Sequence, residues 1–162
     1  MKTNLKETSK KLFSVLTDNK VTFGTAESCT GGLIAKTVTD LSGISEYYFG
    51  TVVSYSNSVK QNVLKVKEDT LKEFGAVSSQ TATQMAEGAC EVLGCDYAVS
   101  TTGIAGPTGG TKEKPVGLVY IACAGKGKKT AVTENHFSGT RKQIREQATE
   151  KALCMLIEQI EK

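Results

Sequence analysis

Three short β-rich runs alternate with helical patterns along this chain, and this alternation limits the possible folds more than any other feature. The runs read VTFGTA at 21–26, YYFGTVVSY at 47–55 and CDYAVSTTG at 95–103. Amphipathic helical patterns precede, separate and follow them. Strands that alternate with helices form mostly parallel sheets covered by helices on both faces.

Two further β-rich runs, at 118–125 and 130–137, flank the basic stretch KGKK. This pattern predicts an antiparallel hairpin, and we interpret KGKK as its solvated tip. The sequence therefore predicts an α/β protein. We expect a three-layer α/β/α sandwich with a mixed, mostly parallel sheet of about five strands.

Helical patterns cover most of the remaining chain. They lie at 5–19, 31–41, 56–66, 68–75, 78–94 and 140–162. Neither a repeat nor a linker interrupts this series, so we expect one domain over residues 1–162.

Composition argues against several classes of protein. The net charge of +3, the few aromatic residues and the absence of Trp give no support for nucleic-acid binding. Five cysteines in no regular spacing and a single histidine do not predict a disulfide framework or a metal site. No apolar stretch is long enough for a membrane span or a signal peptide. We expect a reduced, cytoplasmic protein.

Three polar clusters follow the three β-rich runs. They read ESCTGG at 27–32, SYSNSVK at 54–60 and TTGIAGPTGG at 101–110. Ligands bind at the carboxyl ends of the strands in open α/β sheets. We therefore expect the three clusters to converge on one site.

The first cluster contains two candidate nucleophiles, Ser28 and Cys29. A hydroxyl at this turn can attack a carbonyl while backbone N–H groups at the start of the following helix hold the oxyanion. By residue chemistry alone the thiol is the stronger nucleophile. Equally, Ser28 or Thr30 can serve only to cap that helix.

A serine nucleophile needs a base, and the sequence offers two. His136 lies late in the predicted hairpin, where an ordinary polar strand position explains it. Lys60 lies near the start of a predicted helix, where burial and the helix dipole would disfavour its charge. To act as a base its pKa must fall by roughly three from about 10.4. The alternative is a solvated helix lysine.

The third cluster is rich in glycine, with Gly103, Gly106, Gly109 and Gly110 around Pro107. It lacks the Lys-Ser/Thr pair of a phosphate-binding Walker A loop. Its amides can form an anion-binding concavity, or the segment can be a plain flexible loop.

Five ordered blocks of sequence resemble one known family. They are AESCTGG, VVSYSNSVKQNVLKV, GAVSSQTATQMAEG, TTGIAGPTGGTKEKPVGLVYIA and HFSGTRKQIREQA. Together they strongly resemble the C-terminal domain of the CinA (competence/damage-inducible) proteins, over about residues 5–160. That family includes stand-alone nicotinamide-nucleotide amidases, and the chain is similar to this stand-alone form.

The resemblance implies an activity. It is hydrolysis of the carboxamide of nicotinamide mononucleotide to nicotinic acid mononucleotide and ammonia, in pyridine-nucleotide recycling. No metal or organic cofactor is implied. The partner is a small nucleotide substrate, with no nucleic acid and no membrane, and a homo-oligomer is left open. The alternative is a non-catalytic nucleotide-binding module linked to competence or DNA damage.

The resemblance also implies roles for individual residues. Ser28 is the nucleophile, Tyr55 and Lys60 are the general acid/base pair, Thr102 lies near the reacting centre, and Arg141 is a phosphate partner. Substrate-binding backbone is implied in both glycine-rich clusters, at Cys29, Thr30, Gly31, Gly32, Gly103 and Gly106. Arg145 is a weaker phosphate candidate. Thr140 stands where many relatives are expected to have an acid.

Overall fold

The structure, a computed structural model, describes residues 3–162. Five strands form one sheet in the order β2-β1-β3-β4-β5. They are β1 (Phe23–Glu27), β2 (Tyr48–Val53), β3 (Tyr97–Gly103), β4 (Leu118–Gly125) and β5 (Ala131–His136). β1 pairs in parallel with β2 and β3, whereas β4 is antiparallel to β3 and β5. Only β4 runs against the other four, which confirms the mixed, mostly parallel sheet.

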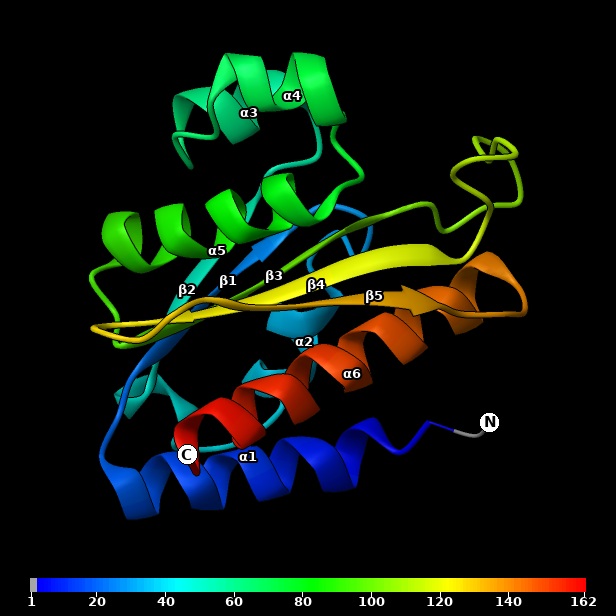
Figure 1. Cartoon of the computed structure of the whole chain (residues 1–162). Helices are drawn as coiled ribbons and strands as arrows, with labels where there is room; N and C mark the ends of the chain where they lie inside the picture. The colour runs from blue at the N-terminus through cyan, green and yellow to red at the C-terminus, as the bar shows by residue number, and fades with distance from the viewer. Residues whose placement is uncertain (1–2) are drawn as a thin grey trace.

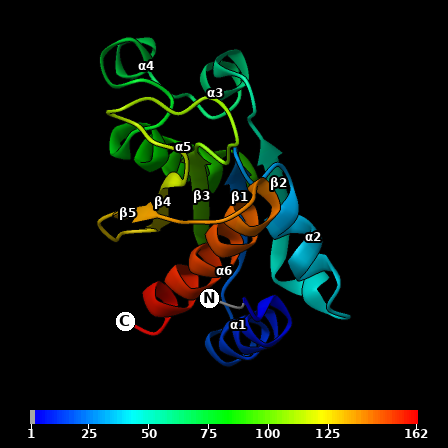
Figure 2. The same cartoon turned by 90° about the vertical axis from the view of Figure 1, so that its right-hand side faces the viewer.

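Helices cover both faces of this sheet. The helices are α1 (Leu5–Asn19), α2 (Leu33–Thr39), α3 (Asn57–Asn62), α4 (Glu68–Phe74), α5 (Ser79–Leu93) and α6 (Arg141–Ile160), with a short 3₁₀ turn at Ile44–Glu46. Helix α5 packs on one face, and α6 and α2 pack on the other (Figure 1). α1 packs outside α6, and α3 and α4 lie beyond α5 (Figure 2). Among residues 3–162, no helix combines the length and apolar character that a membrane span requires.

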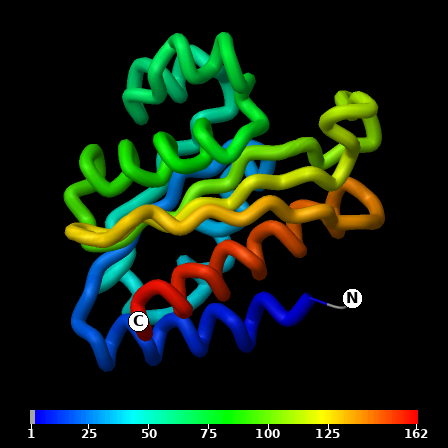
Figure 3. Tube along the Cα trace, in the orientation of Figure 1, coloured from blue at the N-terminus to red at the C-terminus, as the bar shows by residue number. Residues whose placement is uncertain are grey.

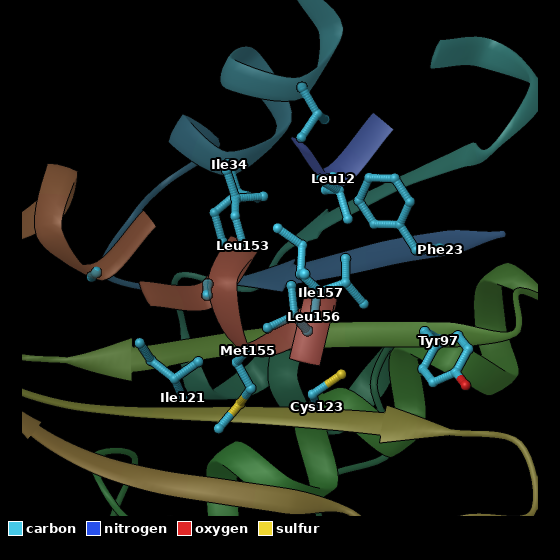
Figure 4. Close-up of a cluster of buried hydrophobic side chains, with 14 of the residues drawn as sticks. Leu12, Phe23, Ile34, Tyr97, Ile121, Cys123, Leu153, Met155, Leu156 and Ile157 are labelled. Carbon is cyan, nitrogen blue, oxygen red and sulfur yellow. The ribbon is translucent and has the colours of Figure 1, made fainter. Parts of the chain in front are cut away.

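The larger part of the core lies between the sheet and the layer of α1, α2 and α6. Phe23 and Ile121 from the strands meet Leu12, Leu153 and Leu156 from α1 and α6 (Figure 4). Alternate residues of each strand point to this face, and one stripe of each helix faces it. Burial of each such side chain stabilises the fold by roughly 2 kcal/mol.

The opposite face depends on small residues of α5. Ala82, Ala86 and Ala89 are fully buried there. A Cβ atom on Gly88 would lie 1.9 Å from the Leu64 carbonyl oxygen, so only glycine permits this approach. The close packing fixes the segment between α3 and α4 against α5. It therefore also fixes the position of α3, which carries Lys60.

Two element boundaries differ from the sequence prediction near the first cluster. The helix expected at 31–41 begins only at Leu33, because Gly31 and Gly32 have φ of 56° and 95°. These values lie in the left-handed region that favours glycine. The strand expected at 47–55 ends at Val53, which leaves residues 54–56 to connect β2 to α3.

The glycine-rich segment between β3 and β4 is a long loop that extends beyond the ends of the strands (Figure 3). Hydrogen bonds hold it in place. The N–H of Gly117 donates to the Ile104 carbonyl at 2.8 Å, which closes its base. The Lys114 ammonium donates to the Phe74 carbonyl at 2.7 Å, which joins the loop to the end of α4.

Candidate active site

A pocket of about 210 Å³ opens where β1 and β3 end, and it brings the three polar clusters together. Its lining comes from the β1–α2 turn, the β2–α3 connection, α3, the α4–α5 connection, the end of β3 with the loop that follows, and the start of α6. The lining residues are Ser28, Cys29, Tyr55, Asn57, Lys60, Ala76, Val77, Thr102, Gly103, Ala105 and Arg141. The convergence expected from the sheet topology is therefore present.

Lys60 and Ser28 are in direct contact in this pocket. The Lys60 Nζ atom lies 3.0 Å from the Ser28 Oγ atom and donates to the Ser54 carbonyl at 2.6 Å. The side chain of Lys60 is 1% exposed. Burial lowers the pKa of Lys60 from 10.5 to about 8, because a desolvated ammonium loses hydration. About a tenth of this lysine is therefore neutral at pH 7.

The α2 helix is capped by Glu27, a residue that we did not include among the predicted site residues. Glu27 is 0% exposed, and its carboxylate accepts hydrogen bonds from the N–H groups of Gly32, Ile34 and Ala35 at 2.9, 3.1 and 2.9 Å. The Thr30 hydroxyl also donates to it at 2.8 Å. Ser28 does not cap the helix, so its hydroxyl is free to face Lys60.

The same capping decides which backbone amides can serve as oxyanion donors. The N–H of Gly31 donates to the Ser28 carbonyl at 3.1 Å, and that of Gly32 is held by Glu27. No oxygen atom within residues 3–162 accepts from the N–H groups of Cys29 and Thr30. The oxyanion role expected of the whole turn is therefore restricted to these two amides, of which Cys29 lines the pocket.

Cys29, the rival nucleophile, is buried beside Ser28. Burial raises the pKa of its thiol to about 11, and the nearby Lys60 charge lowers it only weakly. At neutral pH the group is therefore a thiol and not the reactive thiolate. This environment favours Ser28 over Cys29 as the nucleophile.

Tyr55 and Arg141 form a second contact, at the mouth of the pocket. The Arg141 guanidinium donates to the Tyr55 hydroxyl at 3.0 Å and to the Gly106 carbonyl at 2.9 Å. Tyr55 is 63% exposed, and no hydrogen bond joins it to Ser28 or Lys60 in the described chain. The geometry thus pairs Tyr55 with Arg141, whereas the family resemblance implies a pair with Lys60.

Four of the expected substrate-binding residues do not line the pocket, namely Thr30, Gly31, Gly32 and Gly106. The Thr30 hydroxyl lies 2.7 Å from the Thr101 hydroxyl, in the buried network of Glu27. The Thr30 carbonyl accepts from the Arg145 guanidinium at 2.5 Å, so Arg145 supports the turn. Thr140 caps the N-terminus of α6 through a capping box with Gln143, a structural role that explains a hydroxyl at this position.

Sequence reasoning missed other parts of the site. Asn57 lines the pocket, and its place in the same sequence block as Tyr55 and Lys60 could have indicated this. The Ser54 carbonyl accepts from Lys60, but a backbone group has no residue type by which the sequence could indicate its role. Among residues 3–162, no group of three or more His, Cys, Asp or Glu side chains is arranged to hold a metal ion.

Comparison with known proteins gives a consistent family. Residues 5–160 match the CinA C-terminal domain. The chain is 51% identical over 148 residues to a CinA-like protein of Leptospira borgpetersenii and 55% identical over 142 residues to one of Endomicrobium trichonymphae. These alignments cover 91% and 88% of this chain but only 35% and 33% of the relatives. The chain thus spans about a third of the length of these curated relatives.

A solved structure agrees over nearly the whole chain. The competence/damage inducible protein CihA from Agrobacterium tumefaciens superimposes with a TM-score of 0.94 at 40% sequence identity. The superposition covers 98% of this chain and 96% of that one. The fold, the ordered polar clusters and these matches agree, and the chain belongs to the CinA C-terminal domain family.

Proposed function

We propose that this chain hydrolyses the carboxamide of nicotinamide mononucleotide to nicotinic acid mononucleotide and ammonia. One observation carries the proposal. The Nζ atom of a buried lysine, with a pKa lowered to about 8, lies 3.0 Å from the Ser28 hydroxyl at the floor of a pocket. A neutral amine in hydrogen-bond reach of a hydroxyl is the arrangement that general-base activation of a serine needs.

The proposed reaction proceeds through an acyl-enzyme. Neutral Lys60 has one lone pair and can accept the Ser28 proton as Oγ forms a bond to the carboxamide carbon. The Cys29 N–H stabilises the negative oxygen of the tetrahedral intermediate. The carbon–nitrogen bond then breaks, and the Lys60 ammonium returns the proton to the leaving nitrogen, which departs as ammonia. Water, deprotonated by Lys60, cleaves the ester and releases the acid and Ser28.

The pocket's dimensions favour a small reacting group. Its volume of about 210 Å³ is below the roughly 300–1,000 Å³ of sites that enclose drug-sized ligands. We therefore place the pyridine carboxamide inside and the ribose phosphate at the mouth. There Arg141 and the Tyr55 hydroxyl supply donors for the phosphate, since Tyr55 accepts from Arg141 and keeps its own proton to donate. In this proposal neither a metal nor an organic cofactor takes part, and the reaction occurs in the cytoplasm.

The first test is ammonia release from nicotinamide mononucleotide by the wild-type protein and three variants. We expect Ser28→Ala and Lys60→Ala to lose activity by at least a thousandfold, as removal of a nucleophile or its base does. Cys29→Ala should keep most of it. Near-wild-type turnover by Ser28→Ala or Lys60→Ala would overturn the mechanism, and loss in Cys29→Ala alone would move the nucleophile to the thiol.

A non-catalytic nucleotide-binding module is the competing function, in keeping with names such as "competence/damage inducible protein" among the relatives. Calorimetry on the wild-type protein separates the two. Tight binding of the mononucleotide without ammonia release would favour the module and contradict the proposed amidase.

A further inference from the structure

The hydroxyl proton of Thr102 has a fixed direction in the pocket. It lies near the end of β3, is 1% exposed and lines the pocket. Its hydroxyl donates to the Ala76 carbonyl at 2.7 Å. A carbonyl oxygen can only accept a hydrogen bond, so the direction of this bond is not in doubt.

This bond leaves Thr102 as an acceptor only. A threonine hydroxyl has one proton and two lone pairs, and the proton is committed to Ala76. Any polar group of a ligand that meets the Thr102 oxygen must therefore supply the hydrogen. Turning the hydroxyl toward a ligand acceptor would leave the Ala76 carbonyl without its donor, at a cost of about 1–3 kcal/mol.

Substrate and product of the proposed reaction differ in this property. A carboxamide has an NH₂ group that donates two hydrogen bonds, whereas a carboxylate has only acceptor oxygens. We propose that Thr102 is the residue by which this site distinguishes the carboxamide of the substrate from the carboxylate of the product. This inference rests on the proposed function and adds the basis of its selectivity.

The remaining groups of the pocket orient the carboxamide in the same sense. The N–H of Cys29, which has no oxygen acceptor within residues 3–162, suits the carbonyl oxygen, whereas Thr102 suits the nitrogen. Ser28 then faces the carbon between them, and its Lys60 partner lies within reach of the departing nitrogen. A carboxylate in this position would place an anionic oxygen against the lone pairs of Thr102. The contact with Thr102 therefore weakens binding of the product relative to the substrate.

A binding experiment tests this inference apart from turnover. Calorimetry compares nicotinamide mononucleotide with nicotinic acid mononucleotide on Ser28→Ala, which cannot hydrolyse the amide. We expect the amide to bind more tightly than the acid. Adding Thr102→Val should lower the ratio of amide to acid affinity at least tenfold, because the variant keeps the shape and removes the oxygen. Adding Thr102→Ser instead should preserve the ratio.

Strand β3 offers a matched control. Ser100 lies two residues earlier on the same face, is 0% exposed and donates to the Ala82 carbonyl at 2.6 Å, outside the pocket. Ser100→Ala removes the same kind of buried bond to α5. We expect it to lower the melting temperature and leave the affinity ratio unchanged.

The outcomes separate this inference from the proposed function. Wild-type protein that binds both nucleotides but releases no ammonia would overturn the amidase function. Wild-type turnover with an unchanged affinity ratio in Thr102→Val would overturn the role of Thr102 alone. If Thr102→Val does not fold, a Thr102→Ser variant that loses the ratio while remaining folded would also contradict the inference.

Discussion

Among single residues, Lys60 is the one whose environment is most closely tied to chemistry. Lysine is almost never fully buried without a charged partner. Within residues 3–162, the Lys60 Nζ atom makes hydrogen bonds only to a serine hydroxyl and a backbone carbonyl, neither of which carries a charge. The ammonium form is therefore disfavoured, and the neutral form is available beside the hydroxyl that it can deprotonate.

The pH dependence of activity follows from this residue. With a pKa of about 8, roughly a tenth of Lys60 is neutral at pH 7 and about nine-tenths at pH 9. We expect kcat/KM for ammonia release to rise about tenfold between these pH values. Steady-state assays at constant ionic strength would measure it. A flat profile from pH 7 to pH 9 would argue against Lys60 as the base.

Residue chemistry was predictable from the sequence where side chains act directly. Ser28 and Lys60 were recognised as hydroxyl and amine at the ends of neighbouring strands, and the structure joins them. Which partner Tyr55 takes was not predictable, since this depends on where the first turn of α6 lies relative to β2. The amide donors were also not predictable, because Glu27 withdraws Gly32 from that role.

At the scale of elements, α2 depends on an unusual cap. Helix N-termini are ordinarily capped by a Ser, Thr, Asp or Asn directly before the first turn. Here the cap is a carboxylate at the end of β1 that reaches past two left-handed glycines. Glu27 thereby joins β1 to α2. Its hydrogen bonds also fix the turn between them, which carries Ser28.

We expect Glu27→Gln to destabilise the protein by about 3 kcal/mol, because a buried amide group cannot accept from all of these donors. For a chain of this size the melting temperature should fall by roughly 10 °C. Circular dichroism melts would measure this. Glu73→Gln is the matched control, since Glu73 is exposed on α4 and makes no hydrogen bond or ion pair within residues 3–162. Equal melting temperatures for wild type and Glu27→Gln would contradict the capping role.

The existence and order of the elements were predictable, because apolar residues repeat differently in helices and in strands. The residues at which the elements begin and end were harder to predict. The first strand was expected to begin at residue 21, but it begins at Phe23. Just before it, the N–H of Thr22 donates to the Asp96 carboxylate at 2.8 Å. A contact between residues so far apart in the sequence leaves no local pattern.

At the scale of the whole molecule, the site lowers the stability of the fold. Below pH 8 the folded protein must bury the charged Lys60 ammonium away from water. In the unfolded chain the same ammonium is hydrated. Between pH 8 and 10.5 the unfolded chain binds more protons, so the free energy of unfolding should rise with pH in this window. The burial of Lys60 thus costs up to about 3 kcal/mol at neutral pH.

Lys60→Met should therefore stabilise the protein at pH 7 while removing its activity. Part of the gain is offset by loss of the bond to the Ser54 carbonyl. Guanidinium unfolding at pH 7 and pH 9.5 would measure the difference between variant and wild type, which should shrink at the higher pH. Lys11→Met, at an exposed position on α1, is the control. A Lys60→Met protein less stable than wild type at pH 7 would contradict this account.

The pocket takes Ser28 from the end of the first strand and Arg141 from the first turn of the last helix. Strand β1 must pair with β3, which lies far along the chain, before these two ends can meet. Such non-local pairings form late in folding. If the chain is refolded from denaturant, helical signal should return before catalysis does, and the release of ammonia would report the moment at which the whole chain is assembled.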